Sequence, residues 1–165
     1  MKTGNHKNTF KSVAGFIFWL GICYFTAWIG AQVSPGIASS IWYDSIQKPD
    51  WNPPAWVFGP VWTILYTMMG VAVWLVWKNY GFTKAKAALT AFLIQLFLNG
   101  LWSHIFFGLQ EPGWAFLEII LLLTAIIITT ILFFEKNRVA GWLMIPYILW
   151  VSFATVLNGA IWWLN

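Results

Sequence analysis

This sequence of 165 residues contains few charged residues. It contains nine Lys and Arg and five Asp and Glu, together 8% of the chain, whereas 60% of its residues are hydrophobic. A soluble domain carries about 25% charged residues, because its surface is large relative to its volume. The shortage excludes an ordinary soluble globule and a disordered chain. It also excludes a nucleic-acid-binding module, although the formal net charge is +4.

Cysteine and histidine are also scarce. The single cysteine, Cys23, excludes an intramolecular disulfide and a thiolate metal cluster. His6 and His104 are predicted to lie on opposite sides of the membrane, so no metal site is expected. No nucleophile–base pair, Walker loop or zinc motif is present, which argues against a conventional hydrolase or kinase.

Long uncharged runs are abundant. Five stretches with at most one charged residue lie near residues 12–33, 54–77, 86–108, 113–134 and 139–163. About 20 apolar residues in a helix cross a hydrocarbon core of about 30 Å. The runs are continuously apolar rather than alternating, which excludes a membrane β-barrel. The sequence therefore predicts an all-α membrane protein, a single domain over residues 1–165 built as a bundle of five transmembrane helices. The first helix is too long for a cleaved signal peptide.

Basic residues indicate the orientation. Eight of the nine lie on the side of the N-terminus: Lys2, Lys7, Lys11, Lys78, Lys84, Lys86, Lys136 and Arg138. Cytoplasmic loops are enriched in Lys and Arg. We therefore expect a multi-pass protein of the cell membrane with a cytoplasmic N-terminus, and with the C-terminus and the long first loop outside. That loop, residues 34–53, is aromatic, so it either covers a cavity mouth or forms an interfacial belt.

The 14 tryptophans divide by depth. Those near span ends suit the headgroup level: Trp42, Trp51, Trp77, Trp114, Trp142, Trp162 and Trp163. Trp19, Trp28 and Trp74 either face lipid or pack between helices. Trp56 belongs to the Pro-rich entry to the second span, and a last group, Trp62, Trp102 and Trp150, lies within the spans.

These three indoles belong to helical stripes that carry polar side chains. The stripes are Gly59, Trp62, Tyr66 and Met69; Gln95, Asn99, Trp102, Ser103 and Phe106; and Tyr147, Trp150, Ala154, Leu157 and Asn158. Amides and phenols in hydrocarbon require partners, so the stripes are expected to face the bundle interior. They either hydrogen-bond between helices or line an aromatic ligand cavity.

Other intramembrane residues also carry predictions. Glu118 is a functional candidate, or it is protonated or partnered by His104 or a tyrosine. Pro60 and Pro146 are expected to bend their helices. The small-residue pairs Ala27/Ala31 and Ala87/Ala91 indicate tight packing within the chain or a homodimer contact.

Four long motifs resemble the tryptophan-rich sensory protein family, the bacterial relatives of the mitochondrial translocator protein or peripheral benzodiazepine receptor. They are WYDSIQKPDWNPPAWVFGPVWTILY (42–66), QLFLNGLWSHIFFG (95–108), GWAFLE (113–118) and PYILWVSFATVLN (146–158). The resemblance implies a five-helix bundle, usually dimeric, with a pocket beneath the first loop. It implies binding of porphyrins, of isoquinoline or benzodiazepine-type ligands and, in animals, of cholesterol.

Carried onto matching positions, the resemblance and the stripes together predict one ligand site. Its residues are Tyr43, Pro53, Trp62, Tyr66, Asn99, Trp102, Ser103, Trp150, Ala154, Leu157 and Asn158. The ligand would be protoporphyrin or haem, with no tightly bound cofactor; the other expected partners are membrane lipid and a second copy of the chain. The animal cholesterol motif is absent, because residues 156–165 contain neither Tyr nor a basic residue.

Three functions are compatible with such a site. The first is a receptor-like protein that binds tetrapyrroles for sensing or handling. The second is light- and oxygen-dependent porphyrin degradation, in which the resemblance implicates Trp62 and Trp150 as catalytic residues. The third is transport of the ligand, against which the sequence shows no inverted repeat.

Overall fold

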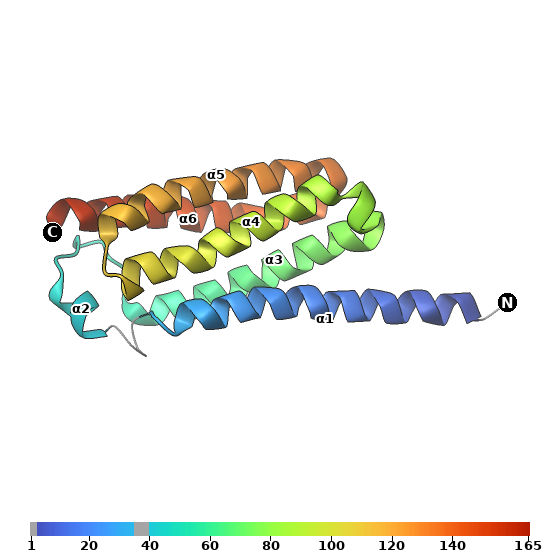
Figure 1. Ribbon diagram of the computed structural model, residues 1–165, viewed down its shortest axis with the longest axis horizontal. Helices are drawn as coiled ribbons and strands as arrows, with labels where there is room; N and C mark the ends of the chain where they lie inside the picture. The colour runs from blue at the N-terminus through green and yellow to red at the C-terminus, as the bar shows by residue number, and fades with distance from the viewer. Residues whose placement is uncertain (1–2, 35–39) are drawn as a thin grey trace.

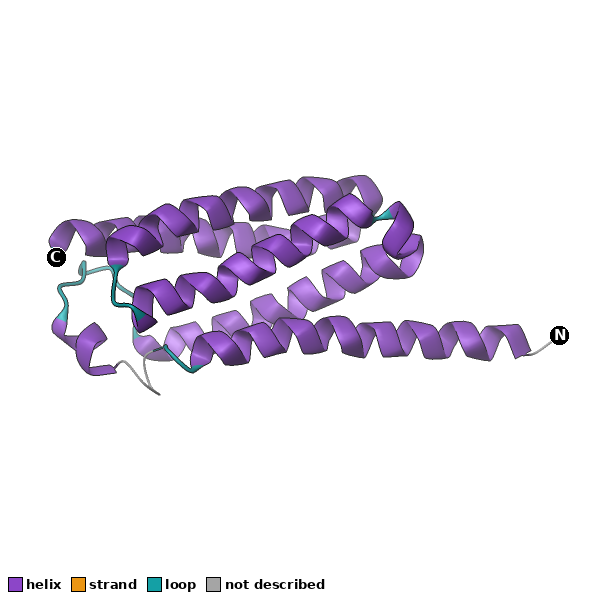
Figure 2. Ribbon diagram, in the orientation of Figure 1, coloured by secondary structure: helices purple, strands orange, loops and turns teal. Residues whose placement is uncertain are grey.

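Helices make up nearly all of the protein in the part that the computed structural model describes, residues 3–34 and 40–165, where no strand occurs (Figure 2). The helical elements are α1 Thr3–Ala31, α2 Ser40–Ser45, α3 Ala55–Lys84, α4 Lys86–Ser103, the π-helix η1 His104–Gly108, α5 Pro112–Lys136 and α6 Arg138–Leu164. Five helical stretches are long and apolar enough to cross a membrane. In hydrocarbon a helix satisfies its own backbone groups, which explains why these runs are helical. The five-helix prediction is confirmed.

The long helices form one bundle, with α2 and the C-terminus at the same end (Figure 1). α5 packs along α4 and α6, while α3 packs against α1 and α6. Glycines bring the helices close together, because an added Cβ at Gly70 would lie 2.6 Å from Leu20 Cδ2. Small residues are the usual means of close helix approach in membranes.

One predicted boundary was wrong. The second span was expected to end near residue 77, but α3 continues to Lys84 through a break at Gly81, where φ is 66° and ψ is −174°. Charged residues mark where the chain leaves hydrocarbon, and a helix does not have to end there. The first loop, expected over residues 34–53, lies between α1 and α3 and contains the short helix α2. Residues 35–39 lie outside the described ranges.

The undecided tryptophans have different environments. Trp19 is fully buried and meets Phe92 edge-on, with 6.0 Å between ring centroids. Trp28 is exposed, which places it toward lipid. The indole N–H of Trp74 donates to the Ser12 carbonyl at 2.9 Å, which joins α3 to α1.

The small-residue pairs also differ from one another. Ala27 packs against the main core, which agrees with the prediction of tight packing within the chain. Ala87 is exposed on α4. A homodimer contact through these residues stays a prediction. α3 and α6 continue as helices through Pro60 and Pro146, whose expected bends likewise stay predictions.

The first loop is packed against the helix ends. Tyr43 is buried and lies edge-on to Phe107, with ring centroids 5.5 Å apart. Burial raises the pKa of Tyr43 above its ordinary value, so the phenol stays protonated and donates to Asn52 Oδ1 at 3.2 Å. Lys48 donates to the Tyr43 and Ile46 carbonyls. The described part of the loop is therefore packed and hydrogen-bonded, and whether it covers a cavity mouth or forms an interfacial belt stays a prediction.

Candidate functional site

Three helices share a hydrogen-bonded polar centre in the bundle. Tyr66 on α3 donates its hydroxyl to Asn99 Oδ1 on α4, and Asn99 Nδ2 donates to the Tyr147 hydroxyl on α6 at 2.8 Å. All three side chains are buried. No water is available in hydrocarbon, so the amide of Asn99 is what satisfies both phenols. The polar stripes thus meet inside the bundle.

A second polar chain lies toward the outer end. Trp102 Nε1 donates to Asn158 Oδ1 at 3.0 Å, and Asn158 Nδ2 donates to the Pro112 carbonyl at 2.8 Å. Pro112 is the first residue of α5, so this chain joins α4, α6 and the start of α5. Interhelical hydrogen bonding, one of the two readings of the stripes, is therefore present at both levels.

The three intramembrane tryptophans lie around these polar groups, and each packs on different aromatic rings. Trp62 packs on Tyr66 and Tyr147, with centroid separations of 5.6 and 6.2 Å. Trp102 stacks on Phe106 at 5.0 Å. The indole of Trp150 lies next to Phe58 at 5.9 Å and Phe153 at 5.6 Å. Aromatic faces thus come from α3, α4, η1 and α6.

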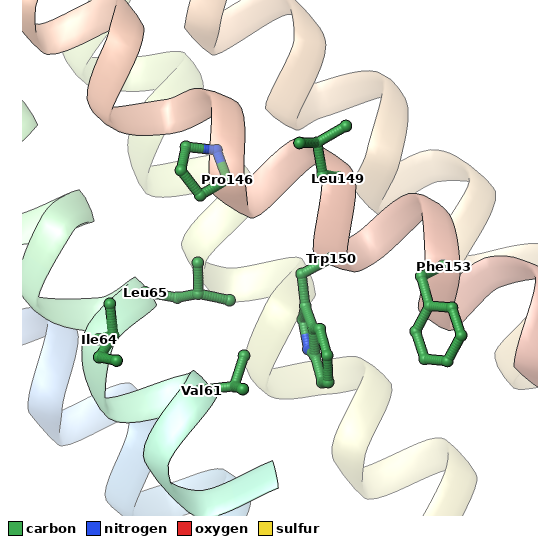
Figure 3. Close-up of a pocket in the computed structure, with 7 residues that line it drawn as sticks. All are labelled: Val61, Ile64, Leu65, Pro146, Leu149, Trp150 and Phe153. Carbon is green, nitrogen blue, oxygen red and sulfur yellow. The ribbon is translucent and has the colours of Figure 1, made fainter. Parts of the chain in front are cut away.

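An apolar hollow of about 380 Å³ lies between α3 and α6. Its lining residues are Val61, Ile64, Leu65, Pro146, Leu149, Trp150 and Phe153. Trp150 extends from α6 toward Val61 and Leu65 of α3 (Figure 3). Ile64 and Leu149 are 59% and 65% exposed, so the hollow opens sideways, toward the lipid of the membrane.

The structure does not bring all the predicted site residues together in one place. Trp150 lines the hollow. Trp62 and Tyr66 follow the lining residues Val61 and Leu65 in the sequence. They belong to the aromatic and polar groups behind the hollow. The remaining predicted residues lie elsewhere. Tyr43 and Leu157 belong to an outer apolar cluster; Ala154 packs on the main core; Pro53 is half-buried in the loop; Ser103 lies against Gly30 of α1.

The hollow also includes residues that sequence reasoning missed. Val61, Leu65 and Phe153 are ordinary apolar residues in apolar spans, so composition does not single them out. Their spacing could have indicated them, because residues three or four apart lie on the same face of a helix. Val61 and Leu65 are four apart, and Phe153 follows Trp150 by three.

Glu118 is buried, and neither of its carboxyl oxygens has a hydrogen-bond partner among the described residues. Of the alternatives left open for Glu118, a hydrogen bond to His104 or to a tyrosine is not present among the described residues, while a functional role and protonation stay predictions. His104 Nδ1 lies 3.0 Å from the Gly100 carbonyl of its own helix instead. Side chains of neighbouring helices meet only where the rotation of each helix allows it, and sequence depth alone does not fix that rotation.

Replacing Asn99 tests the polar centre. Asn99→Leu is expected to lower the free energy of unfolding by about 1–2 kcal/mol, because two buried phenols lose their partner. Thermal unfolding in detergent measures it. Tyr66→Phe in the Asn99→Leu background should then cost less than Tyr66→Phe alone. Equal costs in the two backgrounds would show that the two side chains are not coupled. Asn79→Leu, at an exposed site of α3, is the matched control.

Comparison with known proteins agrees with this architecture. The TspO/MBR family model matches residues 19–164. The translocator protein of Homo sapiens is 44% identical over 123 residues, which is 73% of each chain. The tryptophan-rich protein TspO of Archaeoglobus fulgidus is 38% identical over 158 residues, 96% of this chain and 99% of the relative. The tryptophan-rich sensory protein of Cereibacter sphaeroides is 36% identical over 143 residues, 87% of this chain and 86% of the relative. The resemblance seen in the four motifs is confirmed, and the chain belongs to the TspO/MBR family.

Proposed function

We propose that the protein binds porphyrins and similar flat hydrophobic ligands within the membrane, in a role of tetrapyrrole sensing or handling. The observation that carries the proposal is the hollow of about 380 Å³ whose wall holds Trp150. Its volume falls in the usual range of small-molecule sites, about 300–1,000 Å³. The hollow is lined by apolar side chains, and an indole face offers a stacking surface for a macrocycle.

Polar groups behind the hollow support an orienting role. Leu65 lines the hollow, and its neighbour Tyr66 joins Asn99 and Tyr147 in the polar centre. These three groups lie next to the apolar lining and not in it, and a few polar groups close to an apolar lining are typical of ligand sites. The side opening gives a ligand dissolved in lipid direct access between α3 and α6. In the proposed orientation the N-terminus is cytoplasmic and α2 is outside.

Titration with protoporphyrin tests the proposal. Trp150→Leu is expected to weaken binding about tenfold, since it removes one stacking face worth about 1.4 kcal/mol. The Soret band of the porphyrin measures binding directly, which avoids the overlapping emission of many tryptophans. Trp163→Phe is the matched control, because Trp163 is 88% exposed at the far end of α6. Unchanged affinity in Trp150→Leu would contradict the assignment of the hollow as the site.

One observation favours photochemical degradation as a second candidate. Trp62 lies within 5.6 Å of Tyr66 and 6.2 Å of Tyr147 by ring centroids, so oxidisable side chains adjoin the wall of the hollow. In this reading the excited porphyrin is oxidised by oxygen, with Trp62 and Trp150 beside it. Illumination of the complex with and without oxygen distinguishes degradation from binding. A new absorbing product that needs oxygen and is lost in Trp62→Phe would support degradation, and its absence would leave binding alone.

A further inference from the structure

A second hollow, of about 570 Å³, is lined by residues of α2, of the start of α5 and of the C-terminal end of the chain. These segments lie at the same end of the bundle (Figure 1). The lining residues of this hollow are Trp42, Ile46, Gln110, Glu111, Pro112, Gly113, Trp114, Leu117, Trp162 and Asn165. We call it the rim hollow. It is separate from the hollow between α3 and α6, with which it shares no lining residue. Unlike that hollow, it combines aromatic side chains with a carboxylate.

Specific contacts build the walls of the rim hollow. Phe116 stacks on Trp162 with 5.6 Å between ring centroids, which orients that indole. Gly113 leaves room for it, because an added Cβ would lie 2.8 Å from Trp162 Nε1. On the opposite wall, the backbone N–H of Gln47 donates to Asn165 Oδ1 and Asn165 Nδ2 donates to the Gln47 carbonyl, both at 3.0 Å. The first loop and the C-terminus are therefore joined beside Ile46.

Three indoles and one acid set the chemistry of the rim hollow. Trp42, Trp114 and Trp162 contribute rings, and Glu111 contributes an exposed carboxylate. The structure shows no ion pair for Glu111 among the side chains that it describes, those of residues 9–34 and 41–165. The nearby cation of Lys48 is held by the carbonyls of Tyr43 and Ile46 and lies over the Tyr43 ring. Indole faces and a carboxylate both attract an ammonium group, and the carboxylate repels an anion.

Position in the membrane indicates which ammonium compound fits. The rim hollow lies at the end of two membrane-spanning helices, among tryptophans at the level that lipid headgroups occupy. The N-terminal end of α5 carries a partial positive charge, which favours the phosphate of a zwitterionic headgroup beside its ammonium group. Leu117 and Ile46 continue the lining with apolar surface suitable for the start of an acyl chain.

We propose that the rim hollow binds the headgroup of a phospholipid that carries an ammonium group, of the ethanolamine or choline class. Glu111 pairs with the ammonium group, and the indoles of Trp114 and Trp162 enclose it. This site does not depend on the proposed porphyrin function, since the two hollows have separate linings. Lipid bound there would connect α2 to the start of α5.

Competition between two lipids of equal chain length tests the proposal. The purified protein is exposed to equimolar phosphatidylethanolamine and phosphatidylglycerol with identical chains, and retained lipid is measured by native mass spectrometry. We expect phosphatidylethanolamine to be retained about five-fold more often, in line with modest cation–π and ion-pair attraction at an exposed site. Glu111→Gln and Trp114→Leu are each expected to reduce the preference toward equal retention.

A matched control lies on the same helix. Glu135 is an exposed acid at the other end of α5, so Glu135→Gln should keep the full preference. Equal retention of both lipids by the unaltered protein would overturn the proposal, as would an unchanged preference in Glu111→Gln. Phosphoethanolamine without acyl chains is the remaining arm. If it displaces the lipid at equal concentration, the site takes free ammonium compounds and the assignment to a lipid is wrong.

Discussion

Gly70→Leu is expected to separate α1 from α3 and to lower the free energy of unfolding by about 2–3 kcal/mol, the usual cost of forcing extra volume into a packed interior. A Cβ at Gly70 would meet Leu20 Cδ2 at 2.6 Å and Leu20 Cα at 3.2 Å. The second contact is with backbone, so a change of rotamer in Leu20 cannot relieve it. The helix itself has to move.

The reactivity of Cys23 provides the measurement. It is the only cysteine in the chain and is fully buried on α1, so a maleimide dye labels it only when the bundle opens. Heating in detergent should release the signal at a lower temperature in Gly70→Leu. Gly21→Leu is the matched control, because an added Cβ there meets nothing within 4 Å. If both variants unfold alike, the close approach of α1 and α3 is not what stabilises the bundle.

Glu118→Met is expected to act in the opposite direction and to raise the free energy of unfolding by about 2–3 kcal/mol. Both carboxyl oxygens of Glu118 are buried without a hydrogen-bond partner among the described residues. A buried polar group without partners costs about 1–3 kcal/mol, and this side chain holds two such atoms in a membrane interior. Methionine keeps a similar length and volume and removes the polar atoms.

The same Cys23 labelling experiment measures this effect, and Glu135→Met is its control. Glu135 lies on the same helix and is exposed, so its replacement should change stability by no more than about 0.5 kcal/mol. A lower unfolding temperature for Glu118→Met would show that the carboxyl has a stabilising partner. A stabilising effect would indicate that the acid is retained for a purpose other than stability, as intramembrane acids often are.

Much of the site was predictable in kind but not in arrangement. The stripes of Tyr66, Asn99 and Tyr147 follow helical spacing in apolar spans, and a polar group in hydrocarbon has to turn inward. The sequence did not predict which of these atoms form hydrogen bonds with one another. Asn99 joins two phenols, whereas Trp102 pairs with Asn158, and both outcomes depend on how far each helix is rotated. Spacing along one helix carries no information about the rotation of its neighbour.

The sequence by itself determined that five helices are long and apolar enough to span a membrane, and to which family the chain belongs. These properties depend on run length and on the order of residues, which are one-dimensional. Only the tertiary structure decided that Trp150 faces the hollow while Trp62 packs on phenols, and that Glu118 has no hydrogen-bond partner among the described residues. Contacts such as Gly70 on Leu20 set the distance between helices, and that distance decides which side chains meet.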